Sequence, residues 1–153
     1  MGFVFGTGRY QGLYDKKNLY SSMSKVSSSE AKYINEGRVL RLSTIKPNGN
    51  PHVSPFVYVL DGDKIYISEA YKMSAKNISK NPQVSFIVDT YLEDWAKLQA
   101  CIGTGKAKIL KDGEEYEKAA DLINEKYPQH KAFGKPELVI VIKIDKTKSW
   151  GLE

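Results

Sequence analysis

The stretch VLRLSTIKPNGNPHVSPFVYVLDGDKIYIS, residues 39–68, decides the fold. Two apolar runs, at 39–45 and 53–60, flank an Asn-Gly pair, which supplies the positive φ of a tight hairpin turn. A second turn at 61–63 leads into residues 64–68, where apolar and polar side chains alternate at the period of a strand. The stretch therefore predicts three strands in an antiparallel meander.

The segments on either side of this meander add helices and further strands. Ser27 and Glu30 have the spacing of a capping box and predict a helix over 28–36, which Gly37 ends. Apolar spacing and following prolines predict two more helices, at 74–80 and 114–127, and the remaining strands are expected at 84–88, 101–110 and 138–144. The order predicts an α+β fold, mainly antiparallel, with six strands and flanking helices, compatible with a small barrel.

Two features of the later strands carry further expectations. Gly103 and Gly105 lie two apart on one face of a strand, which indicates a sharp barrel bend or a ligand lying against bare backbone. The strand at 138–144 is too apolar for an edge that faces water. We therefore expect a homodimer that buries more than about 1,000 Å² in total.

Composition sets the broad class of the chain. It has 153 residues with 23 basic and 18 acidic side chains, a net charge of +5, and 41% hydrophobic residues, as in ordinary soluble domains. The single cysteine excludes an internal disulfide and a cysteine metal cluster. No apolar run approaches the roughly 20 residues of a membrane span, so we expect a cytoplasmic protein without membrane contact. Residues 1–26 are expected to form an N-terminal arm, and residues 27–153 one domain.

Catalytic side chains are sparse in the sequence. The two histidines, His52 and His130, lie in separate contexts, and no serine has a nucleophile-elbow pattern. The carboxylates lie mainly in turns or on the exposed face of the long helix, so no acid/base pair stands out. The sequence therefore gives no support to triad hydrolysis or to glycoside hydrolysis.

The segment at 68–77 combines positive charge with hydroxyl groups. Lys72 and Lys76, four residues apart, are expected on one helical face beside hydroxyls and free amide groups, where a phosphate would bind. A solvated basic loop explains the same residues equally well. Five aromatic residues could stack on nucleic-acid bases: Tyr58, Tyr66, Tyr91, Trp95 and Trp150. Packing in the core or an interface is the more frequent role of such residues, so nucleic acid is the less favoured partner.

The segments 42–44, 48–55, 61–68, 76–78 and 81–85, in this order and spacing, resemble the flavin-binding split-barrel family typified by pyridoxamine 5′-phosphate oxidase. The resemblance implies a six-stranded split β-barrel. It also implies a homodimer with FMN, or alternatively the deazaflavin coenzyme F-420, in the grooves between the subunits.

The resemblance also implies which residues would contact the cofactor. The phosphate would bind near His52, Ser68, Lys72, Ser74, Lys76 and Asn77, and the ring would run beside Ser54, Pro55 and Phe56. Trp95, Gln99 and Trp150 would reach the cofactor of the partner subunit. The family's Ser-Arg-Lys phosphate triplet reads Lys72-Met73-Ser74 here, and the substrate-phosphate segment near the C-terminus is absent, so vitamin B6 oxidation is not expected.

The implied activity is that of a flavin-dependent oxidoreductase, which moves hydride or electrons between the flavin and a small-molecule redox substrate. No residue is assigned as a catalytic acid or base. Two other classes stay open: a flavin- or haem-binding or electron-carrier protein without a substrate of its own, and a basic barrel that binds nucleic acid.

Overall fold

The structure is a computed structural model, and it describes residues 25–70 and 72–152. The expected arm at 1–26 therefore lies almost entirely outside the described residues. The elements in chain order are α2 (Ser28–Glu36), β1 (Leu40–Ile45), β2 (Pro51–Phe56), β3 (Tyr58–Asp61), β4 (Lys64–Glu69), α3 (Met73–Lys80), β5 (Gln83–Thr90), η3 (Trp95–Lys97), β6 (Gln99–Leu110), α4 (Glu114–Lys126), η4 (Pro128–Phe133) and β7 (Leu138–Trp150). No helix in this part of the chain is long and apolar enough to cross a membrane.

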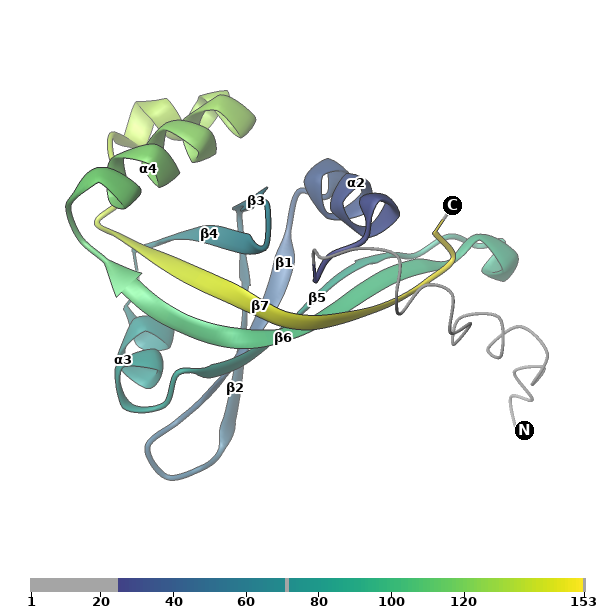
Figure 1. Cartoon of the computed structure of the whole chain (residues 1–153), viewed down its shortest axis with the longest axis horizontal. Helices are drawn as coiled ribbons and strands as arrows, with labels where there is room; N and C mark the ends of the chain where they lie inside the picture. The colour runs from purple at the N-terminus through teal and green to yellow at the C-terminus, as the bar shows by residue number, and fades with distance from the viewer. Residues whose placement is uncertain (1–24, 71, 153) are drawn as a thin grey trace.

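All the strands form one antiparallel, strongly curved sheet in the order β2-β1-β5-β6-β7-β4-β3 (Figure 1). This confirms the prediction of a mainly antiparallel α+β fold. The sheet has seven strands where six were expected, because the segment at 53–60 breaks at Val57. The first half of this segment belongs to β2, which pairs with β1, and the second half belongs to β3, which pairs with β4. The expected meander is therefore two hairpins at opposite edges of the curled sheet.

The local signals that define these hairpins and helices act as expected. Gly49 and Gly62 have φ of +86° and +64° in the two hairpin turns, a conformation that glycine adopts without strain. At the start of α2, the Ser27 hydroxyl accepts from the Glu30 amide, and the Glu30 carboxylate accepts from the Ser27 amide. Both halves of the capping box are thus confirmed.

The core has two parts, one on each face of the sheet. The larger cluster fills the inside of the curl, and a smaller one lies between β3, β4, β7 and helix α4. Strand β7 contributes to both, with Ile140 and Ile142 inside and Val139 and Val141 under α4. Because β7 lies between β6 and β4, its apolar residues are covered within one chain. The inference of a dimer from this strand was therefore wrong, although the dimer itself stays a prediction.

The two strand glycines serve the bend of the barrel. A Cβ on Gly103 would lie 2.2 Å from the Phe86 ring, and one on Gly105 would lie 2.3 Å from the Lys143 carbonyl oxygen. Pairing of β6 with β7 shifts register between Thr104 and Gly105, as in a β-bulge. Bare backbone at these positions is needed for interior packing, and the alternative of a ligand against it has no support.

The end of α4 places a lysine among aromatic rings. Lys126 Nζ lies 4.0 Å from the centre of the Tyr58 ring and 5.4 Å from that of Tyr127. It is buried and has no hydrogen-bond partner in the described part of the chain. Burial, together with the nearby Arg38, lowers the pKa of Lys126 from 10.5 to about 8.

This lysine predicts an unusual pH dependence of stability. From about pH 8 the unfolded chain holds a proton on Lys126 that the folded chain has released, so the free energy of unfolding should rise with pH. Above about pH 9 the rise should weaken and then reverse, because burial raises the pKa of the Cys101 thiol and of the Tyr58 phenol, which keep their protons only when folded. Urea unfolding at pH 7, 8, 9 and 10 measures this. Lys126→Met should lose the rise, and a wild-type stability that declines from pH 8 to 9.5 would refute the assignment.

Candidate functional site

Buried polar side chains meet where β1 and β4 end against helix α3. The Asn77 amide of α3 donates to Thr44 Oγ1 of β1 over 3.0 Å, and both side chains are buried. Glu69, the last residue of β4, is only 2% exposed. Asn77, which the sequence placed at this site, is thus held by a strand residue that sequence reasoning missed.

Glu69 caps the N-terminus of α3. Its carboxylate accepts from the amides of Ser74 (3.1 Å) and Ala75 (2.9 Å), which have no partner within the helix. Burial raises the pKa of Glu69, and the two amide hydrogen bonds and nearby His52 oppose the rise. The amides expected to be free for a phosphate are therefore already bonded to a carboxylate.

Ser74 is the exception to this satisfied network. Its side chain is 1% exposed, and its hydroxyl has no hydrogen-bond partner among residues 25–70 and 72–152. An unsatisfied buried hydroxyl costs about 1–3 kcal/mol. The position therefore favours a ligand or solvent atom that completes the bond.

The two lysines of this segment lie outside the buried cluster. Lys72 precedes α3 with a φ of 64° and is not on the helical face where it was expected. Its Nζ lies 3.0 Å from the Glu137 carboxylate in a largely exposed pair. Lys76 is exposed in the first half of α3. Positive charge is thus present beside the site, and part of it is already neutralised.

Strand β2 brings three of the proposed ring and phosphate contacts to one side. His52, Ser54 and Phe56 alternate as half-buried residues along the strand, and Phe56 packs on the inner core cluster. Pro55 is exposed on the opposite side of β2. The structure therefore groups His52, Ser54 and Phe56 and separates Pro55 from them.

The three residues proposed to reach a partner's cofactor lie at the other end of the molecule. Gln99 begins β6, and its amide donates to the Gly151 carbonyl over 3.2 Å. Trp150 ends β7 opposite Ala100, and Trp95 is 52% exposed in the turn between β5 and β6. Figure 1 shows this turn and the C-terminal end far from α3. One chain does not bring the two groups of residues together.

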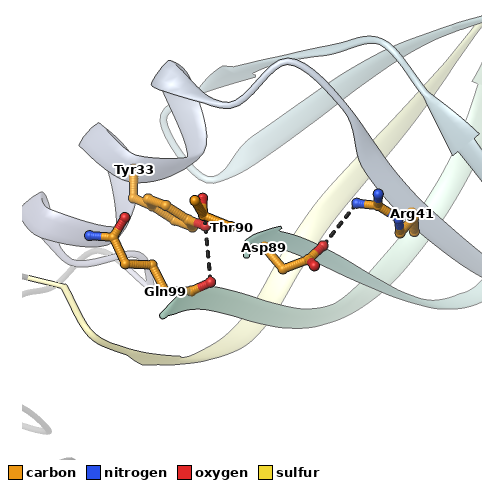
Figure 2. A network of polar contacts seen from close by, with 5 residues as sticks. All are labelled: Tyr33, Arg41, Asp89, Thr90 and Gln99. Carbon is orange, nitrogen blue, oxygen red and sulfur yellow. Dashed lines mark hydrogen bonds and ion pairs between the residues drawn. The ribbon is translucent and has the colours of Figure 1, made fainter. Parts of the chain in front are cut away.

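An open pocket of about 400 Å³ lies beside this second group, between α2 and the ends of β1, β5 and β6. Within it the Tyr33 hydroxyl bonds with Thr90 Oγ1 (2.8 Å) and the Gln99 carbonyl (3.2 Å), as Figure 2 shows. Arg41 pairs with Asp89 at 2.8 Å. Burial raises the pKa of Tyr33. Four separate elements line the pocket, so no local sequence motif marked it.

Ser68 does not join the cluster around Glu69. Successive side chains of a strand point to opposite faces, and the Ser68 hydroxyl lies 3.0 Å from His130 Nε2 of η4. His130 Nδ1 in turn lies 2.9 Å from Asn124 Oδ1 of α4. Sequence reasoning missed this grouping, because 62 residues separate Ser68 from His130 and no motif links them.

Comparison with known proteins gives one family and several solved structures. The family described as pyridoxamine 5′-phosphate oxidase matches residues 29–151. A conserved hypothetical protein from Mycobacterium tuberculosis is 24% identical, covers 85% of this chain and 89% of its own, and has a TM-score of 0.69. No curated protein matches the sequence.

Two other structures share the fold and have described ligands. An FAD-binding protein from Mesorhizobium loti is 21% identical over 77% of this chain and 87% of its own, with a TM-score of 0.66. A haem storage protein from Vibrio cholerae is 16% identical over 79% of this chain and 90% of its own, with a TM-score of 0.67. At these identities the similarity shows the fold alone.

Proposed function

The chain belongs to the pyridoxamine 5′-phosphate oxidase family, and from this premise we propose that it binds FMN and acts as an oxidoreductase on a small-molecule substrate. The observation that carries the proposal is the buried Ser74 hydroxyl at the start of α3, which has no hydrogen-bond partner within the described part of the chain and has Lys72 and Lys76 on either side of it in sequence. A phosphate oxygen would satisfy that hydroxyl, and the two ammonium groups would balance its charge.

The residues present fit a phosphate held by side chains. They do not fit one held by the α3 amides, because Glu69 occupies those of Ser74 and Ala75. Lys72, Lys76 and His52 are the donors that remain, and Ser74 adds its hydroxyl. Glu69 has a different task in this arrangement, since it stabilises the N-terminus of the helix that carries Lys76.

The half-buried side of β2 provides the surface for the flavin ring. Ser54 and Phe56 lie on the same side of the strand as His52, so a ring placed there would have one polar and one aromatic neighbour. When bound, FMN supplies the hydride and electron chemistry. The chain itself binds and orients the cofactor and shields it from water, and we assign no residue as a catalytic acid or base.

Haem is the alternative cofactor, and it would need a different contact. A haem needs an axial ligand, often a histidine with a nitrogen available to iron. Both ring nitrogens of His130 are already hydrogen-bonded, to Ser68 and to Asn124, so His52 on the half-buried side of β2 is the histidine that a haem would use. A visible spectrum distinguishes the cofactors, because FMN, a deazaflavin and haem absorb at different wavelengths.

We also propose that the complete site forms between two copies of the chain. Trp95, Gln99 and Trp150 lie at the opposite end of one chain from α3, so only a second copy could bring them to the same cofactor. Apolar side chains on the outer face of the sheet support an interface, with Val53 of β2 66% exposed and Ile102 of β6 also exposed. Light scattering should give a dimer, and a 17 kDa particle at micromolar concentration would contradict it.

The phosphate contacts predict how variants bind. Lys72→Ala should weaken FMN binding about tenfold to a hundredfold, because a hydrogen bond from a charged donor contributes about 1.5–3 kcal/mol. Lys76→Ala should have a similar effect and Ser74→Ala a smaller one. Fluorescence titration of the apoprotein measures these affinities, and the losses should shrink as salt rises.

Two controls make this titration specific. Lys80→Ala removes an exposed lysine from the far end of α3 and should leave the affinity unchanged. Glu137→Gln releases Lys72 from its ion pair and should strengthen binding. Equal affinities for riboflavin and FMN would show that the protein does not recognise the phosphate. The lysines would then be part of a solvated surface and not of a binding site.

A further inference from the structure

Ser68, His130 and Asn124 form a linear hydrogen-bonded series that the flavin proposal does not use. They come from β4, η4 and α4, with 3.0 Å between Ser68 Oγ and His130 Nε2 and 2.9 Å between His130 Nδ1 and Asn124 Oδ1. Both contacts lie within hydrogen-bond range and are partly buried. The order is hydroxyl, imidazole and side-chain acceptor, as in a catalytic triad.

The chemistry of the third residue fixes the protons of the other two. An amide oxygen only accepts, so the contact with Asn124 Oδ1 requires the proton of His130 on Nδ1. The neutral ring then has its lone pair on Nε2, which faces the Ser68 hydroxyl. Ser68 therefore donates to His130, and the imidazole is in the tautomer that can remove the serine proton.

We propose that Ser68 is a nucleophile with His130 as its general base, and that this site hydrolyses small carboxylic esters. Ser68 Oγ bonds to the ester carbonyl carbon as its proton passes to His130 Nε2. The carbon–oxygen bond to the alcohol then breaks, and the alcohol leaves with that proton. Water, deprotonated by the same imidazole, attacks the acyl-serine, which releases the acid and restores the hydroxyl.

Asn124 is the positioning residue of this series. It holds the tautomer and orientation of the imidazole, but it has no charge to stabilise the imidazolium that forms during the reaction. An aspartate at this position would accept from the same Nδ1–H and add that charge. Asn124→Asp should therefore raise the rate several-fold, an effect that a purely structural hydrogen bond would not produce.

The series is separate from the proposed flavin site. Ser68 and His130 are half-buried, whereas Glu69 turns to the other face of β4 and caps α3. The Ser68 and His130 side chains each keep part of their surface exposed, and a small activated ester is the substrate that needs least room to reach them.

The test uses the full chain without added flavin. Wild type should hydrolyse p-nitrophenyl acetate, and a fluorophosphonate probe should label Ser68, located by peptide mass. Ser68→Ala and His130→Gln should each lower the rate about 100-fold, the scale of general-base catalysis. Ser85→Ala, at another half-buried strand serine, should keep the wild-type rate.

The same experiment can overturn the proposal. Thermal melting of each variant identifies any that fail to fold, and Asn124→Asp supplies a gain of rate that unfolding cannot mimic. A folded wild type that is no faster than Ser68→Ala and is not labelled at Ser68 would show that the series only fastens η4 to the sheet. Because no flavin is present, that outcome would leave the FMN proposal unaffected.

Discussion

Gly105→Ala is expected to destabilise the fold by about 3 kcal/mol or more. The added Cβ would lie 2.3 Å from the Lys143 carbonyl oxygen and 3.0 Å from Ile142 Cγ2. Both belong to the neighbouring strand β7, and a backbone oxygen next to the register shift cannot rotate away as a side chain can. Overpacking of a core costs about 1–3 kcal/mol, and more where backbone must move. Denaturant unfolding measures the loss.

Gly49→Ala is the matched control for this change. A Cβ there meets nothing within 4 Å, so the only cost is the φ of +86°, about 1–2 kcal/mol. Gly105 does not have a positive φ, so the loss on Gly105→Ala comes from its contacts with β7 and should exceed the loss on Gly49→Ala. Equal losses would mean that β6 and β7 can separate at the bulge, contrary to the packing described here.

Glu30→Ala is the second change with a large expected effect, about 2–4 kcal/mol. The buried carboxylate accepts from the Ser27 amide (3.0 Å), the Thr147 hydroxyl (2.7 Å) and the Ser149 hydroxyl (2.8 Å). It therefore caps α2 and fastens that helix to the end of β7. Hydrogen bonds to a charged group contribute about 1.5–3 kcal/mol each, although losses within one network are not additive.

Glu36→Ala, an exposed change in the same helix, controls for the loss of one negative charge. It should alter the free energy of unfolding by less than about 0.5 kcal/mol. Chemical denaturation of both variants compares them directly. A Glu30→Ala protein as stable as Glu36→Ala would show that the bonds to Thr147 and Ser149 contribute nothing.

Short-range signals in the sequence predicted the fold well, and long-range pairing explains what was missed. The capping box at Ser27 and Glu30 and the turn at Gly49 depend on neighbouring residues alone, so they could be recognised directly. The last half of β7, at 145–150, is polar and gives no apolar pattern. It is a strand because β6 pairs with it, for example at Cys101 and Ser149.

The same distinction applies to the candidate sites. Lys72, Ser74 and Lys76 are close in sequence and were found together, although the bond from Glu69 to the α3 amides was not foreseen. The residues of the proposed ester site come from three elements and share no motif. Their grouping follows only from the packing of α4 and η4 on the outer face of β4.

We propose that this chain binds FMN in a site completed by a second copy. Sedimentation velocity with FMN, recorded at the visible absorption of the flavin, tests both parts in one measurement. We expect the flavin to sediment with a particle of about twice 17.2 kDa, at one flavin per chain. Protein that sediments without colour, while all the flavin stays behind as free small molecule, would contradict it.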